Sequence, residues 1–529
     1  MRLLCLALAA LTTANTFSQS PDDLPRLISN NGHHALLVDG KPFLILGGQV
    51  HNSSAWPGIL PNVWAAASQL HLNTVEIPVY WEQVEARPGN YDLSLVDTLL
   101  AQGRQHGVRL VLLWFGTWKN GSNHYIPLWM KQDAKKYPNI TGNKGQPIDS
   151  PSPHGEATEQ ADTKAFAAFM HHLKMADAKH TVIMVQIENE SGSWGSVRDY
   201  SSQAQKLFEG PVPAQLLQPG LLRALNRPLD TKGSWREVFA QRADEYFQAW
   251  SIATFVGKVA AAGKAEYPLP LYVNAALRDP LTDPTAESYE SGGPTDNVIP
   301  IWKAAAPAID LLAPDIYLQG TERVNKVLEL YSRTDNPLFV PEIGLRPENA
   351  KYFDAVLARG GIGFSPFGID NVGAAEPSSR LDPFAANYAV VAPMMPQLAK
   401  WNLEGKIKAV VESDDHAPQS LDLGSWQILV HFGLGEREKL SANPNSDGKL
   451  MIIQLQENEF LLIGDKCHVV FQPAGRNAGK AWQYGTVEEG SYEQGEFKRL
   501  RILNGDETDW GGPHFGTKPT VLRATLIAR

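Results

Sequence analysis

Between residues 43 and 365 the chain alternates short apolar runs with longer helical stretches. Eight such runs stand out: FLILGG (43–48), TVEIPV (74–79), RLVLLWF (109–115), TVIMVQIE (181–188), LPLYVN (269–274), IDLLAPDIY (309–317), PLFVPE (337–342) and GGIGFSPF (360–367). This alternation is typical of strand-helix units, which build parallel sheets. Eight units with polar and aromatic residues at the carboxyl ends of their strands predict a closed (β/α)8 barrel. An open doubly wound sheet is the competing architecture.

The pattern changes after about residue 400. The runs IKAVVE, SWQILVHF, LMIIQLQ, EFLLIG and VLRATLIAR follow one another, separated by turns rich in Asn, Asp and Gly. Such runs are typical of antiparallel strands. We therefore expect an α/β barrel over residues 19–400 and a smaller, antiparallel β-sandwich-like domain over residues 401–529. An insertion between the fourth and fifth strands, residues 191–268, contains a long helical segment and is expected to shape the cleft.

The first residues have the layout of an export signal. Arg2 precedes the apolar run Leu3–Leu11, and small residues follow. This layout predicts a signal peptide over residues 1–18 and an exported protein, periplasmic or extracellular. The run is shorter than the ~20 apolar residues that a membrane span needs. Removal of the signal takes Cys5 and leaves Cys467 without an internal disulfide partner.

The composition of the chain limits the kinds of molecule that the protein is expected to bind. The 529 residues carry a net charge of −10, so the chain has no basic field to hold a phosphate backbone, and we expect no nucleic-acid partner. The chain has 14 Trp, and such rings stack on the apolar faces of sugars, although core packing explains them equally well. Neither an H-E-x-x-H nor a C-x-x-C motif is present, so we predict no metal and no cofactor. Sequence leaves the oligomeric state open, a homodimer included.

Two predicted strands end in glutamates. The segment MVQIENE places Glu188, Asn189 and Glu190 at the end of the fourth strand, and LFVPEIG places Glu342 at the end of the seventh. A closed barrel brings both strand ends around one axis. Two carboxyl groups facing each other across a cleft are what glycosidic bond cleavage requires, one protonated and one ionised. A single glutamate in such a place more often meets solvent or caps a helix.

These strand ends resemble the catalytic sites of the clan A retaining glycoside hydrolases. In that pattern the acid/base follows an Asn directly, which selects Glu190 over Glu188, and Asn189 binds the sugar 2-hydroxyl. The resemblance makes Glu342 the nucleophile. Tyr317, at the end of PDIYL, resembles the tyrosine that hydrogen-bonds this nucleophile.

Within the clan, the first half resembles glycoside hydrolase family 35, the β-galactosidases. GGQVHN, which contains His51, resembles the family's G-x-x-H-Y, and NTVEIPVYWEQVEARPGNYDL resembles its second-strand region. Three family positions differ: one tyrosine is Pro78, another is Asn52, and the A-E-W of the third strand reads Gly-Thr-Trp at 116–118. The sequence is similar to a divergent bacterial subgroup with a β-rich C-terminal domain, which includes xyloglucan side-chain galactosidases.

The resemblance implies an exported, exo-acting retaining β-galactosidase that removes terminal galactose from oligosaccharides or plant polysaccharide side chains. Because these contacts are replaced, another glycosidase of the clan, of β-glucosidase or α-L-arabinosidase type, remains an alternative. A carbohydrate-binding barrel without turnover is the alternative outside catalysis. Besides Asn189 and Tyr317, the side chains expected to touch the carbohydrate are His51, Trp81, Trp118 and Trp194.

Overall fold

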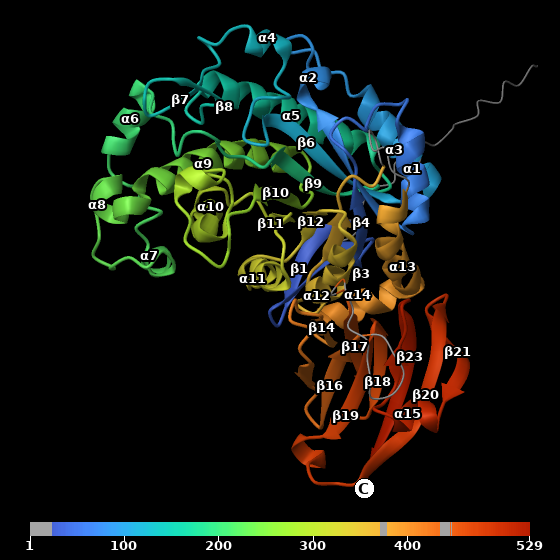
Figure 1. The fold of residues 1–529 in the computed structure, drawn as a ribbon. Coiled ribbons are helices and arrows are strands. Elements are labelled where there is room, and N and C mark those ends of the chain that lie inside the picture. The colour runs from blue at the N-terminus through green and yellow to red at the C-terminus, as the bar shows by residue number, and fades with distance from the viewer. Residues whose placement is uncertain (1–23, 371–377, 434–444, 446) are drawn as a thin grey trace, which may run out of the picture.

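The computed structural model describes residues 24–370, 378–433, 445 and 447–529 (Figure 1). The predicted signal peptide, residues 1–18, lies outside the described residues. Eight parallel strands close into a barrel in the order β4-β5-β6-β9-β10-β11-β12-β13. They are β4 (Ile45–Gln49), β5 (Thr74–Tyr80), β6 (Arg109–Lys119), β9 (Val182–Asn189), β10 (Leu271–Ala276), β11 (Leu311–Ile316), β12 (Val340–Ile343) and β13 (Gly363–Pro366). The prediction of a closed barrel is confirmed, and each of the eight apolar runs overlaps one barrel strand.

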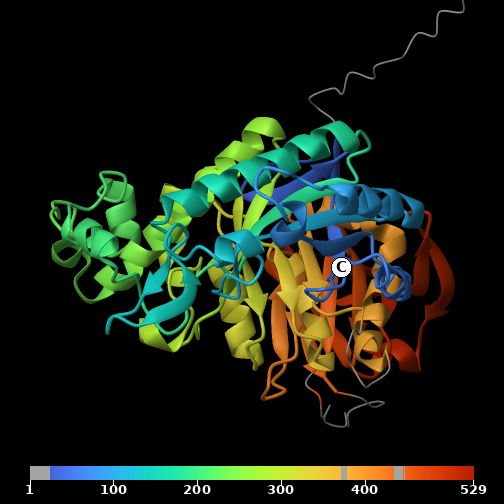
Figure 2. The same cartoon turned by 90° about the horizontal axis from the view of Figure 1, so that it is seen from above.

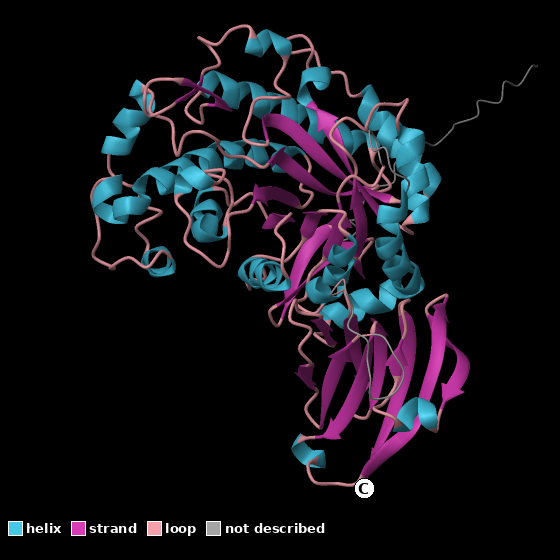
Figure 3. Ribbon diagram, viewed as in Figure 1, coloured by secondary structure: helices cyan, strands magenta, loops and turns pink. Residues whose placement is uncertain are grey.

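The barrel strands are apolar along their whole length because both faces are covered. Every residue of β5 and β9 is buried. Inside, their side chains fill the barrel, and outside they meet a layer of helices, which Figure 3 shows around the strands. The helices that follow barrel strands include α1 (Leu60–Gln69), α3 (Ser94–His106), α5 (Glu156–Ala176), α9 (Ala243–Glu266), α10 (Ile299–Ala305), α11 (Thr321–Tyr331) and α12 (Tyr352–Leu357).

The insertion after β9 builds a separate group of short helices. They are α6 (Ser202–Glu209), α7 (Pro219–Ala224) and α8 (Trp235–Phe239), and they lie at the end of the molecule away from the C-terminal strands (Figure 2). Helix α9 then returns along the barrel wall beside α5. It is buried on most of its circumference, since the barrel covers one side and the insertion helices cover part of the other. The loops that follow β5 and β6 add the short helices α2 (Trp81–Val84) and α4 (Leu128–Lys131). The second of these loops also forms a hairpin of β7 (Asn139–Thr141) and β8 (Pro147–Pro151).

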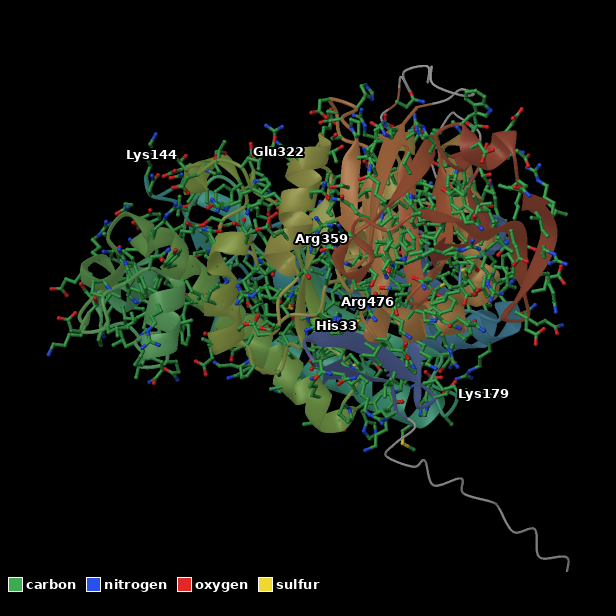
Figure 4. The ribbon with its side chains drawn as sticks, turned by 90° about the horizontal axis from the view of Figure 1, so that it is seen from below. His33, Lys144, Lys179, Glu322, Arg359 and Arg476 are labelled. Carbon is green, nitrogen blue, oxygen red and sulfur yellow. The ribbon has the colours of Figure 1, made fainter. Side chains whose placement is uncertain are left out.

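An antiparallel sheet precedes the barrel, and the sequence reasoning missed it. It consists of β1 (Arg26–Asn30), β2 (His33–Val38) and β3 (Lys41–Phe43). Asp39, in the β2–β3 turn, is 2.5 Å from the guanidinium of Arg109 at the start of β6. Figure 4 shows His33 of β2 and Lys179, which precedes β9, on the same face of the molecule. The small sheet therefore closes the end of the barrel where the strands begin, away from the strand ends that carry the glutamates.

The C-terminal part consists of two antiparallel sheets, which confirms the predicted β-rich domain. One has six strands: β14 (Ile407–Val411), β17 (Lys449–Gln456), β18 (Glu459–Asp465), β23 (Thr520–Ala528), β20 (Trp482–Glu493) and β21 (Glu496–Leu503). The other has four: β15 (Gln419–Asp422), β16 (Trp426–Phe432), β19 (Cys467–Pro473) and β22 (His514–Phe515). A second hydrophobic core fills the space between the sheets.

The other face of the six-stranded sheet packs on the barrel. Ile407, Met451 and Val521 belong to the same hydrophobic core as the barrel helices α13 (Asp382–Val391) and α14 (Met395–Leu403). Helix α14 runs across residue 400, and the domain bounds 19–400 and 401–529 stay a prediction. Over the described residues, no helix combines the length and apolarity that a membrane crossing demands.

Candidate active site

Glu190 follows strand β9 at the mouth of the barrel. The backbone is left-handed at Glu188 (φ 59°) and at Glu190 (φ 44°), on both sides of Asn189. This conformation costs a side-chain-bearing residue about 1 kcal/mol or more and is concentrated at functional sites. The Glu190 N–H donates to Asn274 Oδ1 at 3.0 Å, and its carbonyl accepts from the Gly121 N–H at 2.9 Å. Residues from the ends of β6 and β10 therefore hold Glu190 in its strained conformation.

Glu342 lies on β12 and is 5% exposed. Its Oε2 accepts a hydrogen bond from Gln49 Nε2 at 2.6 Å, and its Oε1 accepts one from the Tyr317 hydroxyl. Burial and the neighbouring Glu342 charge raise the pKa of Tyr317, so its hydroxyl keeps its proton and remains a donor. Two hydrogen-bond donors, from β4 and from the end of β11, therefore hold the Glu342 carboxyl group in place.

The electrostatic environment separates the roles of the two glutamates. Burial raises the pKa of Glu190 to about 7, and the negative charge of Glu342 adds to this rise. The Lys119 ammonium and a hydrogen bond with Asp315 act in the opposite direction. Glu190 is therefore protonated up to about neutral pH beside a carboxylate held by donors. Such a difference between two neighbouring carboxyl groups is what a general acid and a nucleophile require.

Asp315 and Asn274 belong to the same cluster, and the sequence reasoning missed both. Asp315 on β11 is the register neighbour of Glu342 on β12. Its Oδ2 accepts from Asn274 Nδ2 at 2.5 Å, and burial followed by the charge of Glu342 raises its pKa well above the usual value. A signal was present: the run PDIY places an acidic residue two positions before Tyr317 at a strand end. Residues two apart on a strand point to the same face.

Lys119 brings a positive charge to this acidic cluster. Its Nζ donates to Asn189 Oδ1 at 2.7 Å and also to Asn120 Oδ1. Asn189 is buried, and its Nδ2 has no hydrogen-bond partner among the described residues. An amide donor left unpaired in a buried place is available to an oxygen of a bound ligand.

His51 and Trp194 lie on different sides of the mouth. The His51 ring nitrogen Nδ1 is 2.6 Å from Asp370 Oδ1, and the ring packs edge-on against Phe367 at 5.3 Å. Phe367 in turn contacts the ring of Tyr317 at 6.4 Å, which places His51 on the side of Glu342. Trp194 follows Glu190 in the chain, and its side chain is 49% exposed.

Trp81 and Trp118 are corrections to the predicted set of sugar-binding residues. Both are 0% exposed, so neither has a ring face to offer to a carbohydrate. The Trp81 indole N–H donates to Glu85 Oε2 at 2.9 Å. The Trp118 ring packs edge-on against Phe255 of α9 at 4.8 Å, while its backbone N–H donates to Glu188 at 2.7 Å. Both side chains pack into the hydrophobic core rather than lining the mouth.

Glu188 differs sharply from Glu190, two residues further along the chain. Its side chain is completely buried, and burial raises its pKa well above the usual value. It accepts the backbone hydrogen bond of Trp118, so it supports the strand end from within the wall. No set of three or more His, Cys, Asp or Glu side chains in the described part of the chain is placed to hold a metal ion.

Comparison with known proteins finds one matching family model and distant relatives. Residues 384–513 match the model of a family described as a domain of unknown function (DUF5597). A β-galactosidase of Xanthomonas manihotis is 27% identical over 210 residues, which are 39% of this chain and 32% of that protein. Beta-galactosidase 14 of Arabidopsis thaliana is 25% identical over 163 residues, 30% of this chain and 17% of that protein. The chain thus spans about a third or less of the length of these relatives.

Solved structures show a similar arrangement at low identity. The β-galactosidase of Bacillus circulans sp. alkalophilus superposes with a TM-score of 0.48 and 11% identity, over 91% of this chain and 99% of that one. The β-galactosidase of Rahnella sp. R3 gives a TM-score of 0.47 and 16% identity, over 70% of this chain and 58% of that one.

Proposed function

We propose that the protein is an exo-acting retaining β-galactosidase that releases terminal β-galactose from oligosaccharides or plant polysaccharide side chains such as those of xyloglucan. One observation supports the reaction. Burial and the charge of Glu342 raise the pKa of Glu190 to about 7, and the Glu342 carboxyl group accepts two hydrogen bonds.

The proposed reaction is a double displacement. Glu190 donates its proton to the glycosidic oxygen while Glu342 attacks the anomeric carbon, and the leaving group departs as an alcohol. A covalent glycosyl-enzyme results. Water then attacks the same carbon, gives its proton to Glu190, and Glu342 leaves as a carboxylate, so the anomeric configuration is retained. In this scheme the free Nδ2 of Asn189 donates to the sugar 2-hydroxyl.

The choice of galactose rests on sequence likeness to the β-galactosidases named above. A second glycone, β-glucose or α-L-arabinose, is favoured by the replaced contacts. Pro78 lies within the buried strand β5, and Thr117, at the place of the glutamate in the A-E-W segment, is buried and donates its hydroxyl to Asp162 Oδ2 at 2.5 Å. The polar side chains that the family uses at these places are therefore absent, and other residues must recognise the sugar hydroxyls.

The test is hydrolysis of p-nitrophenyl β-galactoside, β-glucoside, α-arabinoside and β-xyloside, together with galactosylated xyloglucan oligosaccharides. We expect the β-galactoside to be cleaved fastest and galactose to be released from the oligosaccharides. Dominant activity on another glycoside would change the proposed glycone and leave the proposed mechanism in place. Binding of these sugars without turnover of any of them would favour the carbohydrate-binding barrel and refute the proposal.

The two roles are tested separately by covalent labelling. A 2-deoxy-2-fluoro-β-galactoside with a good leaving group should accumulate on Glu342, and mass spectrometry of the peptide that contains it should show the added sugar. Glu342→Gln should abolish both labelling and hydrolysis. Glu190→Gln should block glycosides with poor leaving groups far more than activated ones, because only poor leaving groups need the proton. Label on another residue would refute the assignment.

We also propose that the protein is exported after removal of a signal near residue 18, as the N-terminal layout suggests. The mass of the mature protein recovered from the periplasm or the medium tests this. The same material, examined by light scattering, decides between a monomer and a homodimer.

A further inference from the structure

Three loops meet beside Glu190. They follow the strands β6, β9 and β10, and backbone hydrogen bonds join them. Gly121 donates to the carbonyl of Glu190 at 2.9 Å. Ser193 and Ser291 exchange two hydrogen bonds, at 2.9 and 3.0 Å, which fix the second loop against the third. The residues between these contacts are therefore held in place rather than left as free loop tips.

Glu290 lies at the centre of this junction. It is 2% exposed, and neither of its carboxyl oxygens has a hydrogen-bond partner of good geometry among the described residues. The chain makes room for it with two glycines: a Cβ at Gly121 would lie 2.8 Å from Glu290 Oε1, and a Cβ at Gly192 would lie 2.6 Å from its Cγ. A buried carboxyl group without partners destabilises the fold, so its presence calls for a functional reason.

The surroundings of Glu290 favour its uncharged, protonated form. Burial raises its pKa well above the usual value, and the charge of Glu190 adds to the rise, while Lys119 opposes it. In this form it carries one O–H donor and one carbonyl acceptor.

Trp194 covers Glu290 and faces solvent. Its Cδ1 atom lies 3.0 Å from the point where a Gly121 Cβ would be, next to the 2.8 Å contact of Glu290 Oε1. The indole lowers the pKa of Glu290, which is the effect of a polar N–H facing a carboxyl group. About half of the Trp194 side chain is exposed to solvent. Trp194 is thus seated on a buried polar group while its ring remains open to a ligand.

The position of Trp194 relative to Glu190 and Glu342 decides which part of a substrate its ring can touch. Trp194 and Glu290 adjoin Glu190 through β6, β9 and β10. The partners of Glu342 come instead from β4 and from the end of β11. In a retaining glycosidase the acid/base protonates the leaving oxygen, so the leaving group lies on its side. The ring therefore belongs to the leaving-group side of the cleft.

We propose that Trp194 forms the binding subsite for the leaving-group sugar and that Glu290 is the positioning residue that sets the orientation of the indole. This inference rests on the proposed retaining glycosidase function. The chemistry it selects is a pyranose ring with an apolar face, which stacks on the indole. The preferred substrates are consequently glycosides whose leaving group is itself a sugar. Glycosides of small alcohols have no sugar ring to stack on Trp194.

The test compares two substrates with the same glycone, a glycosyl fluoride and a disaccharide. Fluoride leaves without a proton and occupies no sugar subsite. For a galactosidase the pair is β-galactosyl fluoride and lactose. If the panel above identifies another glycone, the matching fluoride and disaccharide are used. We expect Trp194→Ala to lower kcat/KM on the disaccharide about ten-fold or more, chiefly through KM, and to leave the fluoride within about two-fold. The matched control is Trp510→Ala, which removes an indole of similar exposure, 45%, from the C-terminal domain.

Glu290 is tested with two substitutions of similar size. Glu290→Gln keeps one donor and one acceptor beneath the indole, so it should retain disaccharide activity within a few-fold. Glu290→Leu removes the polar contact, and disaccharide kcat/KM should fall as in Trp194→Ala. Its melting temperature should change little or rise, because the substitution also removes the cost of burying a carboxyl group. A purely structural residue would show the opposite: a lower melting temperature and an equal loss on both substrates.

Each outcome decides the proposal. Equal losses on fluoride and disaccharide, or no loss on the disaccharide, would overturn the subsite while leaving the glycosidase function in place. If the wild-type protein hydrolyses no fluoride of any glycone in the panel, the proposed function fails, and the subsite fails with it.

Discussion

The pKa of Glu190 should fall when Glu342 loses its charge. Glu342→Gln keeps the size of the side chain and removes the negative charge that faces the acid/base. Burial and this charge together raise the pKa of Glu190 from 4.5 to about 7. The difference of about 2.5 units corresponds to about 3.4 kcal/mol of differential interaction with the charged form.

The share that belongs to Glu342 can be bounded. Two unit charges about 5.5 Å apart, the usual separation in retaining glycosidases, interact by about 3 kcal/mol at an effective dielectric constant of about 20. Burial is the larger cause of the rise, and Lys119 and Asp315 already offset part of it. We therefore expect the pKa of Glu190 to fall by about 1 unit in Glu342→Gln and to stay well above that of a solvated glutamate.

The measurement is a carbon-13 NMR titration of protein labelled at the glutamate carboxyl carbon, with Glu190→Gln identifying the resonance. The matched control is Glu266→Gln at the far end of α9, where the same chemical change should leave the Glu190 titration in place. A midpoint near 7 in Glu342→Gln would refute the role of the Glu342 charge. A midpoint near 4.5 in the wild-type protein would refute the role of burial.

The consequence for the reaction is direct. In the proposed reaction, formation of the glycosyl-enzyme turns Glu342 into an uncharged ester, so its repulsion no longer adds to the raised pKa of Glu190. Glu190 then loses its proton more readily and becomes the base that activates water. Loss of this charge thus assists the change of Glu190 from acid to base, while burial remains the larger cause of its raised pKa.

Three further substitutions probe the surroundings of the pair. Lys119→Met removes the cation that favours ionised Glu190, so the pKa of Glu190 should rise. Because only protonated Glu190 acts as the acid, the alkaline limb of the plot of kcat/KM against pH should move to higher pH. A shift of this limb to lower pH would contradict the argument. Tyr317→Phe removes one of the two donors to Glu342 and should lower kcat about ten-fold or more with a small change in thermal stability, measured by steady-state kinetics beside a melting curve; unchanged kcat would show that the hydrogen bond is catalytically idle. Trp81→Phe should lower the free energy of unfolding by about 1–3 kcal/mol in a denaturant titration and leave KM unaltered, because the ring is a core residue; a raised KM with unchanged stability would restore Trp81 to the sugar site.

The barrel could be predicted from the chain because its strands carry a strong local signal. A parallel strand covered on both faces must be apolar at nearly every position. The strands β5, β6 and β9 have such mainly apolar sequences, and helical stretches separate them. The early antiparallel sheet was missed for the opposite reason. Strands β1 and β3 are short and half exposed, so their composition does not differ from that of a loop.

Glu190, Glu342 and Tyr317 could be found in the chain because each stands directly at the end of an apolar run and because their spacing resembles a known pattern. Strand ends of a barrel share one face, so local position implies a common site. The aromatic residues gave no such information. Trp118 lies near the end of β6 and Trp194 follows β9, yet one is buried against α9 and the other is half exposed.

What local sequence leaves undetermined is which groups approach across the barrel. Glu290 follows β10 by more than ten residues and meets Gly121, from the loop after β6, only because the strands curve round one axis. Asp315 meets Glu342 through the register of two strands. The pKa of Glu190 likewise depends on burial and on charges distant in sequence. Residue order determines the strands and the chemistry at their ends, whereas closure of the barrel sets the distances and the dielectric surroundings that decide how that chemistry acts.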